Sequence, residues 1–381
     1  MSTTDPPLAR ATLAVHAGSL ADPHGGLNTP VYPSSAYAYH RDGEIRYPRY
    51  FNTPNQLAAA AKIAALEGAE SALLFSSGMA AISTALLALV APGDEVLLAA
   101  GLYGGTDHFV RHELEPRGIA IRFAPPSAAD LLAALGDRSR LILVESPTNP
   151  LLNIIDLRAL AAEARRRGVL TMVDNTFATP IVQQPLALGC DLVMHSATKY
   201  LGGHSDLCAG VLAGSAELIG PCREIASRYG GCLNAFDAWL LERSMKTLAV
   251  RVDKQNATAA SLAPWLAADS RIDKVYYPGL KTNAGHHIAS RQMTAYGAMI
   301  SFNLATTLDP DAFEQHLRLI RPAVSLGGVE STICRPCLTS HAKMAPAERA
   351  RLGIGDRLFR LSVGLEDIAD LSADLSLALD E

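Results

Sequence analysis

Short apolar runs recur along the first two thirds of the chain, and stretches of helical composition separate them. Runs typical of buried strands lie at 72–75, 95–100, 140–145, 169–174, 191–195 and 210–213. Helices are predicted at 55–66, at 80–90, from about residue 107, and at 156–167. This alternation of strands and helices predicts an α/β fold with a mostly parallel, doubly wound sheet.

The two ends of the chain have different patterns. Residues 1–51 are rich in Pro, Gly and Ser and show no helical period, which predicts an extended arm. One long helix is predicted over 236–254, bridging to a smaller α/β region with a strand at 298–304, a helix at 311–319 and a final helix after Asp370. We therefore expect an arm at 1–51, a large domain at 52–250 and a smaller C-terminal domain at 251–381.

Composition narrows the class of protein. Hydrophobic residues make up 49% of the chain and charged residues 19%, which favours large cores over disorder. The net charge of −5 and the lack of a long basic run argue against nucleic acid or anionic membrane as partners. Residues 71–93 carry no charge, but Ser76, Ser77 and Gly78 interrupt them, so we interpret them as a strand, a turn and a buried helix.

Cysteine use and the N-terminus suggest a compartment. The N-terminal residues lack a basic segment followed by an apolar core, so no secretory signal is visible. The six cysteines are scattered, which suggests reduced thiols in a cytoplasm. Cys334 and Cys337 form a C-x-x-C without a second pair, and ordinary thiols explain them better than zinc or redox chemistry.

The stretch HSATKYLGGHSD at 195–206 holds the main candidate chemistry. Lys199 follows two hydroxyl residues, Ser196 and Thr198, and precedes a glycine pair. A desolvated lysine amine can form an imine with an aldehyde while nearby groups anchor a phosphate. Upstream, Asp174 ends an apolar strand, where an aspartate can hold a proton on a pyridine nitrogen. A lone lysine is usually a surface charge, but this combination predicts a pyridoxal phosphate site.

Three other positions fit such a site, although each has a simpler explanation. The turn Ser77, Gly78, Met79 precedes a helix whose N-terminus can bind a phosphate, or it is only a connector. Arg360 lies in an apolar strand pattern, where it needs a ligand anion or an acidic partner. Tyr103 follows a strand end, where its ring can stack on a cofactor or pack in the core.

Metal and dinucleotide sites have less support. His108 and His112 are spaced i, i+4, but no third ligand is apparent, and a solvated helix face explains them better. No Gly-x-Gly-x-x-Gly follows the first strand of a strand–helix–strand unit, which argues against a dinucleotide. We therefore predict no metal and no dinucleotide cofactor.

Four segments carry a family resemblance: ESPTNP at 145–150, VDNT at 173–176, SATKY at 196–200 and GHSD at 203–206. With them the chain resembles, over nearly its whole length, the Cys/Met-metabolism family of pyridoxal phosphate enzymes. That family includes cystathionine γ-synthase, cystathionine γ- and β-lyases, methionine γ-lyase and O-acylhomoserine sulfhydrylases. The resemblance implies the aspartate-aminotransferase-like fold (fold type I), pyridoxal 5'-phosphate as cofactor, and a homo-oligomer, a tetramer built as a dimer of active dimers.

The resemblance also implies roles for individual residues. Lys199, Tyr103 and Asp174 are expected to be catalytic, and Asn149, Ser325, Arg360 and Tyr103 to bind the substrate, with Arg360 and Ser325 on its α-carboxylate. Tyr47 and Arg49 are expected to reach the cofactor phosphate of the neighbouring subunit, although Asn52, Thr53 and Pro54 replace the usual Asn-Pro-Thr. The expected cofactor-binding residues are Tyr47, Arg49, Ser77, Gly78, Met79, Tyr103, Asn149, Asp174, Thr176, Ser196, Thr198 and Lys199.

Two positions bear on the reaction. Within the family that this chain resembles, methionine γ-lyases carry a cysteine at the position of Gly105. Cystathionine γ-synthases and γ-lyases commonly carry Glu at the position of Val324. The prediction is a C–S lyase that eliminates from a thioether amino acid such as cystathionine, by the β or the γ route. The alternatives are γ-replacement on an activated homoserine and methionine γ-lyase activity. A non-catalytic sensor on the same fold would be expected to lack the lysine, and Lys199 is present.

Overall fold

The computed structural model describes residues 8–39, 43, 45–342 and 344–380, and within these ranges it contains two β-sheets. The first is a 7-stranded sheet of order β1-β7-β6-β5-β4-β2-β3. Only β7 runs antiparallel to its neighbours, so the sheet is mostly parallel, as predicted. Its strands are β1 (Ser71–Phe75), β2 (Glu95–Ala99), β3 (Ala120–Ala124), β4 (Ser139–Glu145), β5 (Leu170–Asp174), β6 (Leu192–Ser196) and β7 (Gly210–Gly214).

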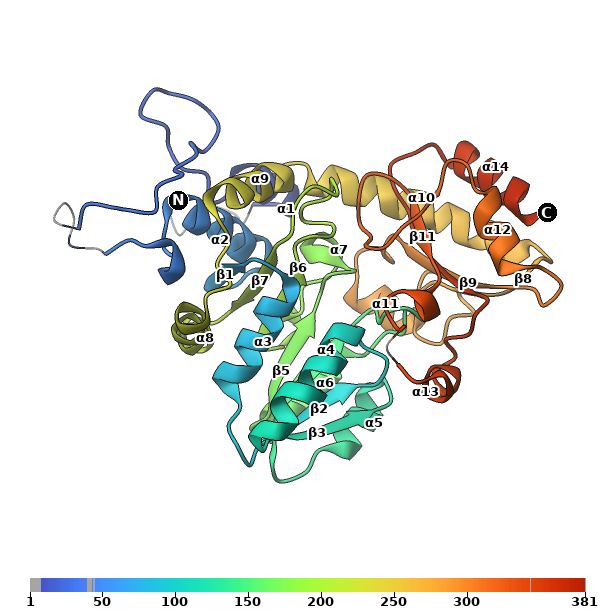
Figure 1. The fold of residues 1–381 in the computed structure, drawn as a ribbon, viewed down its shortest axis with the longest axis horizontal. Coiled ribbons are helices and arrows are strands. Elements are labelled where there is room, and N and C mark those ends of the chain that lie inside the picture. Colours follow the sequence, from blue (N-terminus) through green and yellow to red (C-terminus); the bar gives the residue numbers. More distant parts are fainter. Residues whose placement is uncertain (1–7, 40–42, 44, 343, 381) are drawn as a thin grey trace.

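Helices cover this sheet (Figure 1). The apolar side chains of α3 (Gly78–Leu89) and α8 (Ala216–Tyr229) join one buried cluster with strand residues, whereas α5 (Ala128–Ala134) and α6 (Leu157–Arg166) join another. The helix predicted at 55–66 is α2 (Pro54–Glu67), which ends at Gly68 in the left-handed conformation (φ 70°). The uncharged stretch at 71–93 forms β1 and α3, as interpreted from the sequence.

The second sheet lies in the C-terminal part of the chain (Figure 1). Among the described residues it has five strands in the order β10-β11-β12-β9-β8. The strands are β8 (Ile272–Tyr276), β9 (Met299–Leu304), β10 (Arg321–Pro322), β11 (Thr332–Cys334) and β12 (Leu358–Ser362). The helices that accompany it are α11 (His286–Gln292), α12 (Pro310–His316), α13 (Pro346–Arg351) and α14 (Ile368–Leu379).

The single long helix predicted over 236–254 is wrong. The structure has two helices, α9 (Ala235–Met245) and α10 (Leu248–Ala268), separated by Lys246 and Thr247. The buried guanidinium of Arg251 donates to the carbonyl oxygens of Ser244 (3.0 Å) and Tyr200 (2.8 Å). This tertiary contact satisfies the last turn of α9 and fixes the break, and no local pattern in the sequence announces it.

Helix α10 connects the two halves of the molecule (Figure 1). Leu248 and Val252, near its start, belong to a core cluster shared with the first sheet, and Leu262 and Leu266 belong to the core of the second sheet. The helix thus changes partners along its length, and the domain boundary near residue 250 stays a prediction.

The N-terminal arm contains a helix that the sequence analysis did not expect, α1 (Arg10–His16). Lys62 of α2, which is fully buried, donates from its ammonium group to the carbonyl oxygens of Ala14 (3.0 Å) and Val15 (3.3 Å). Arg10 donates to the carbonyl oxygen of Ile181 at 3.1 Å. A seven-residue helix is marginal alone, so these contacts stabilise it.

Two short helices follow strands β2 and β5. The helix expected from about residue 107 begins earlier, as α4 (Gly104–Phe109), and continues into a π-helical turn at Val110–Leu114. A short α7 (Thr179–Val182) follows β5. None of the helices in the described part of the chain is both long and apolar enough to cross a membrane.

Candidate active site

A cavity of about 580 Å³ lies where several strands of the first sheet end and meets residues of the C-terminal part of the chain. The ends of β4, β5 and β6 contribute to one wall, and residues around 324–326, 338–340 and 360 contribute to the other. Carboxyl ends of parallel strands are the usual place for a ligand in such sheets. All the predicted site residues line this cavity except Tyr47 and Arg49: Ser77, Gly78, Met79, Tyr103, Asn149, Asp174, Thr176, Ser196, Thr198, Lys199, Ser325 and Arg360.

Asp174 is the last residue of β5 and is held by the residue two positions on. Its Oδ1 accepts hydrogen bonds from the backbone amide (3.0 Å) and the hydroxyl of Thr176. The Thr176 hydroxyl oxygen in turn accepts from the backbone amide of Ser196 at 2.8 Å, which ties β5 to β6. Burial raises the pKa of Asp174, while the Thr176 bonds and the nearby His195 and Lys199 oppose the rise.

Lys199 lies on the loop after β6. Its ammonium nitrogen donates to the Ser325 hydroxyl oxygen at 2.6 Å, a contact between residues 126 positions apart. Burial, and next the positive charge of Arg360, lower the pKa of Lys199 from 10.5 to about 8. About a tenth of this amine is therefore uncharged at pH 7, and the uncharged amine is the form that attacks an aldehyde.

Arg360 enters the cavity from β12 and is 5% exposed. Its Nη1 donates to Oδ1 of Asn149 at 2.7 Å, and its Nη2 lies 3.5 Å from the carbonyl oxygen of Ser325. Its Nε has no hydrogen-bond partner among the described residues. A buried guanidinium without an acidic hydrogen-bond partner in these contacts, and with a free donor, fits an anionic ligand such as a carboxylate.

The turn before α3 packs closely against the end of β6. The Ser77 hydroxyl oxygen accepts from the Ala80 amide at 3.1 Å and caps the helix. A Cβ atom at Gly78 would lie 3.0 Å from Cβ of Ser196, and one at Gly210 would lie 2.0 Å from the carbonyl oxygen of Ser77. Glycines at both positions therefore allow a helix N-terminus and a hydroxyl to share one corner of the cavity, as a phosphate site requires.

Glu145 also lines the cavity, although from the sequence it was recognised only as the first residue of the ESPTNP motif. Its Oε1 accepts from the backbone amide of Tyr103 (2.7 Å), and its Oε2 accepts from that of Asn149 (3.2 Å). Burial, and next the charge of Asp174, raise its pKa to about 8. The feature that could have identified Glu145 as a site residue is its register, because it ends β4 directly beside Asp174 on β5.

Besides Val324, whose identity bears on the reaction, the rim of the cavity has residues that the sequence did not predict. Val324 and Leu338 are 72% and 60% exposed at its rim, and Cys208 is an exposed free thiol beside it. Thr339 and Ser340 complete this side. Val324 and Cys208 lie in loops, and Leu338 ends a short 3-10 helix (Pro336–Leu338), so the hydrophobic pattern does not predict their position.

Tyr47 and Arg49 lie away from the cavity of their own chain. Arg49 donates to the carbonyl oxygen of Ser227 at 2.5 Å, and its guanidinium lies 5.8 Å and 5.6 Å from the ring centres of Tyr47 and Tyr50. Their predicted place at the site of a neighbouring subunit stays a prediction. Within the described ranges no group of His, Cys, Asp and Glu side chains is arranged to hold a metal.

The fold and this cavity define a class of protein. The family model described as "Cys/Met metabolism PLP-dependent enzyme" matches residues 11–380, so the chain belongs to this family and is a pyridoxal phosphate enzyme. The resemblance inferred from the four motifs and the fold type are thereby confirmed.

Proteins similar to this chain include both lyases and synthases. The chain is 42% identical to a cystathionine β-lyase of Lactococcus lactis, over 97% of this chain and 98% of the relative. It is 40% identical to a cystathionine γ-lyase of Bacillus subtilis, over 98% of this chain and 100% of the relative. The structure of cystathionine γ-lyase from Lactobacillus plantarum complexed with L-serine superposes with a TM-score of 0.94, at 37% identity, over 98% of this chain and 99% of the other.

The residues of this chain fit pyridoxal phosphate. Lys199 supplies a partly uncharged amine, and Asp174 supplies a carboxylate acceptor. The corner at Gly78 and Ser196 forms a cradle that a larger side chain at position 78 would fill. Nε of Arg360 has no hydrogen-bond partner among the described residues, so it is available to donate to an anionic group such as a carboxylate.

Proposed function

We propose that this enzyme is a carbon–sulfur lyase that eliminates from a thioether amino acid such as cystathionine. The observation that carries the proposal is the Lys199 amine, with its pKa of about 8, in one cavity with Asp174 and Arg360. The similarity to a cystathionine β-lyase and a cystathionine γ-lyase supports elimination as the reaction.

Each of these residues has a task in the proposed reaction. Pyridoxal phosphate, when bound, supplies an electron sink for the electrons released at the α-carbon. Arg360 and the Ser325 hydroxyl bind the α-carboxylate and so orient the α-hydrogen toward Lys199. The Lys199 amine, once displaced by the amino acid, takes the α-proton as general base. Asp174 stabilises a proton on the pyridine nitrogen as long as it stays ionised.

Elimination also requires a proton for the departing sulfur, or its release as a thiolate. Tyr103 is 43% exposed at the cavity, and its hydroxyl is the group we propose for this proton transfer and for contact with the ring face. The buried Glu145 carboxyl fixes the backbone at Tyr103 and Asn149 on either side of the site.

Gly105 supports a preference for substrates other than methionine. A Cβ atom at this position would lie 2.5 Å from the Tyr103 ring, so any side chain there would move the ring from its present place. Val324 lies at the cavity rim, at a position where cystathionine γ-synthases and γ-lyases commonly have Glu. This chain therefore has no acidic side chain there. We therefore propose thioether amino acids as a class, without restriction to cystathionine.

Product analysis tests the proposal. The purified holoenzyme is incubated separately with L-cystathionine, L-methionine, L-cysteine and O-succinylhomoserine, and the 2-oxo acids are identified. Pyruvate from cystathionine indicates β-elimination and 2-oxobutyrate indicates γ-elimination. Turnover of O-succinylhomoserine only when a thiol is added, with no turnover of cystathionine, would replace the lyase by a γ-replacement enzyme.

We also propose a homo-oligomer, a dimer or a dimer of dimers, in the cytoplasm. The placement of Tyr47 and Arg49 outside the cavity of their own chain is compatible with a contribution to a second copy. Mass measurement in solution and cell fractionation test these two points.

A further inference from the structure

We propose that His195 and Glu67, buried behind the active-site face of the sheet, are positioning residues that hold Asp174 in place and ionised. The proposal rests on the proposed role of Asp174 opposite the cofactor ring nitrogen. Neither residue lines the cavity, so they act through Asp174 and have no contact with a substrate.

His195 and Glu67 form a close, dry pair. Nε2 of His195 lies 2.6 Å from Oε1 of Glu67, and the two side chains are 1% and 0% exposed. His195 is on β6, next to Met194, which is the register partner of Asp174 on β5. Glu67 is the last residue of α2. A buried carboxylate is costly unless hydrogen-bond donors compensate it, and the ring N–H of a histidine can be such a donor.

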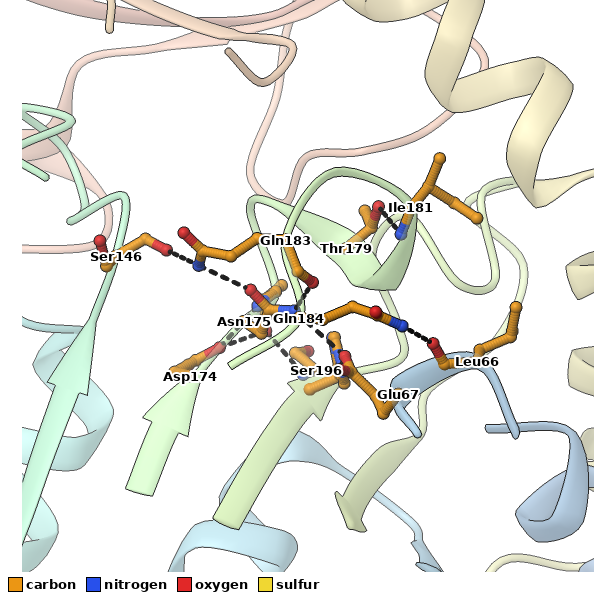
Figure 2. A network of polar contacts seen from close by, with 12 residues as sticks. Leu66, Glu67, Ser146, Asp174, Asn175, Thr179, Ile181, Gln183, Gln184 and Ser196 are labelled. Carbon is orange, nitrogen blue, oxygen red and sulfur yellow. Dashed lines mark hydrogen bonds and ion pairs between the residues drawn. The ribbon is translucent and has the colours of Figure 1, made fainter. Parts of the chain in front are cut away.

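A network of amides keeps this pair in position (Figure 2). Asn175, directly after Asp174, donates from Nδ2 to Oε1 of Glu67 (3.1 Å) and to the carbonyl oxygen of Gln183 (2.9 Å). The Gln183 amide donates to Oδ1 of Asn175 (3.0 Å) and to the carbonyl oxygen of Ser146 (2.7 Å), beside the cavity-lining Pro147. The backbone at Asp174 is thereby fixed to α2 and to the loop after β4.

The charges around Asp174 explain why such a pair is useful. Burial raises the pKa of Asp174, and an ionised Glu145 beside it would work in the same direction. His195 and Lys199 act in the opposite direction and lower the pKa of Asp174, and Arg10 faces Glu67 from α1. Both polar contacts of the Glu67 carboxylate, from His195 and from Asn175, are made by Oε1, whereas Oε2 has no hydrogen-bond partner within the described chain.

The test is a double-mutant cycle on cofactor retention, measured as the dissociation constant of pyridoxal phosphate from the full-length enzyme. His195→Gln and Glu67→Gln are each made in the parent and in an Asp174→Asn background. In the parent each should weaken cofactor binding about tenfold, the lower range for residues one step behind a ligand. In the Asp174→Asn background the same changes should have little further effect, because the group they act on is gone.

Gln292→Met is the matched control. Gln292 donates to Gln183 (3.1 Å) and to the carbonyl oxygen of Ile155 (3.0 Å), at the uncharged end of the same network. It should lower thermal stability and leave the dissociation constant near that of the parent. Glu67→Gln keeps the shape of the side chain, so it remains informative if His195→Gln fails to fold.

The proposal is overturned if the His195 and Glu67 variants weaken binding equally in both backgrounds, or if Gln292→Met weakens it as much. It is also overturned if Asp174→Asn binds the cofactor as the parent does, since nothing would then act through Asp174. None of these results depends on turnover, so a failed lyase assay leaves the outcome readable.

Discussion

Replacing Arg360 by Gln should make Lys199 a poorer nucleophile toward its cofactor. Burial comes first and the charge of Arg360 second among the causes that lower the pKa of Lys199 from 10.5 to about 8. At pH 7.5 a pKa of about 8 leaves roughly a quarter of the amine uncharged, whereas a pKa of 10.5 would leave about one molecule in a thousand. The cavity therefore raises the reactive fraction by roughly two hundredfold.

The sign of the effect follows from the charge. Without the positive guanidinium the protonated amine is less disfavoured, so the pKa of Lys199 rises toward 10.5 but does not reach it, because burial remains. The assay is the rate at which apoenzyme regains the visible absorption band of bound cofactor, measured from pH 6 to pH 10. The rise of this rate with pH should have its midpoint near 8 in the parent and at a higher pH in Arg360→Gln.

Ser325→Ala is the control, because it removes the 2.6 Å contact to Lys199 without removing a charge. Its profile should stay closer to that of the parent than the profile of Arg360→Gln. An Arg360→Gln profile that coincides with the parent, or moves to lower pH, would refute the electrostatic reasoning.

Three other changes have defined outcomes. Asp174→Asn should bind substrate but lower kcat by about a hundredfold or more, a typical loss for a group that controls proton chemistry; a kcat within threefold of the parent would contradict this role. Gly210→Ala should destabilise the fold by about 1–3 kcal/mol in urea unfolding, because the new methyl would lie 2.0 Å from the Ser77 carbonyl oxygen, whereas Gly220→Ala, with open space around it, should be neutral or stabilising. Arg49→Ala should reduce cofactor occupancy after dialysis, and full occupancy would exclude its proposed contact with the phosphate in a second copy.

The active site was more predictable than the elements around it, for a physical reason. Lys199 and Gly78 follow strands, and Asp174 ends one. Because parallel strands bring their carboxyl ends to one edge of the sheet, the strand pattern predicts that these residues lie close together. The break between α9 and α10 depends on Arg251 reaching Ser244 and Tyr200, which is a tertiary contact. A 3.6-residue pattern continues through such a break and does not indicate it.

Other parts of the site depend on geometry that residue identity alone does not carry. Glu145 could be recognised only through its register with Asp174, and His195 only through the fold that brings Glu67 to 2.6 Å from it. The rim residues Val324, in a loop, and Leu338, at the end of a short 3-10 helix, are 72% and 60% exposed, so no pattern of buried positions predicts their place.

The most direct test of the proposed function compares the parent enzyme with Lys199→Ala on L-cystathionine, with pyruvate and 2-oxobutyrate as the measured products. The account predicts steady formation of one of these 2-oxo acids by the parent, and none above background by Lys199→Ala prepared with the same concentration of pyridoxal phosphate. Equal rates from the two proteins would contradict the central claim that the amine of Lys199 carries the reaction.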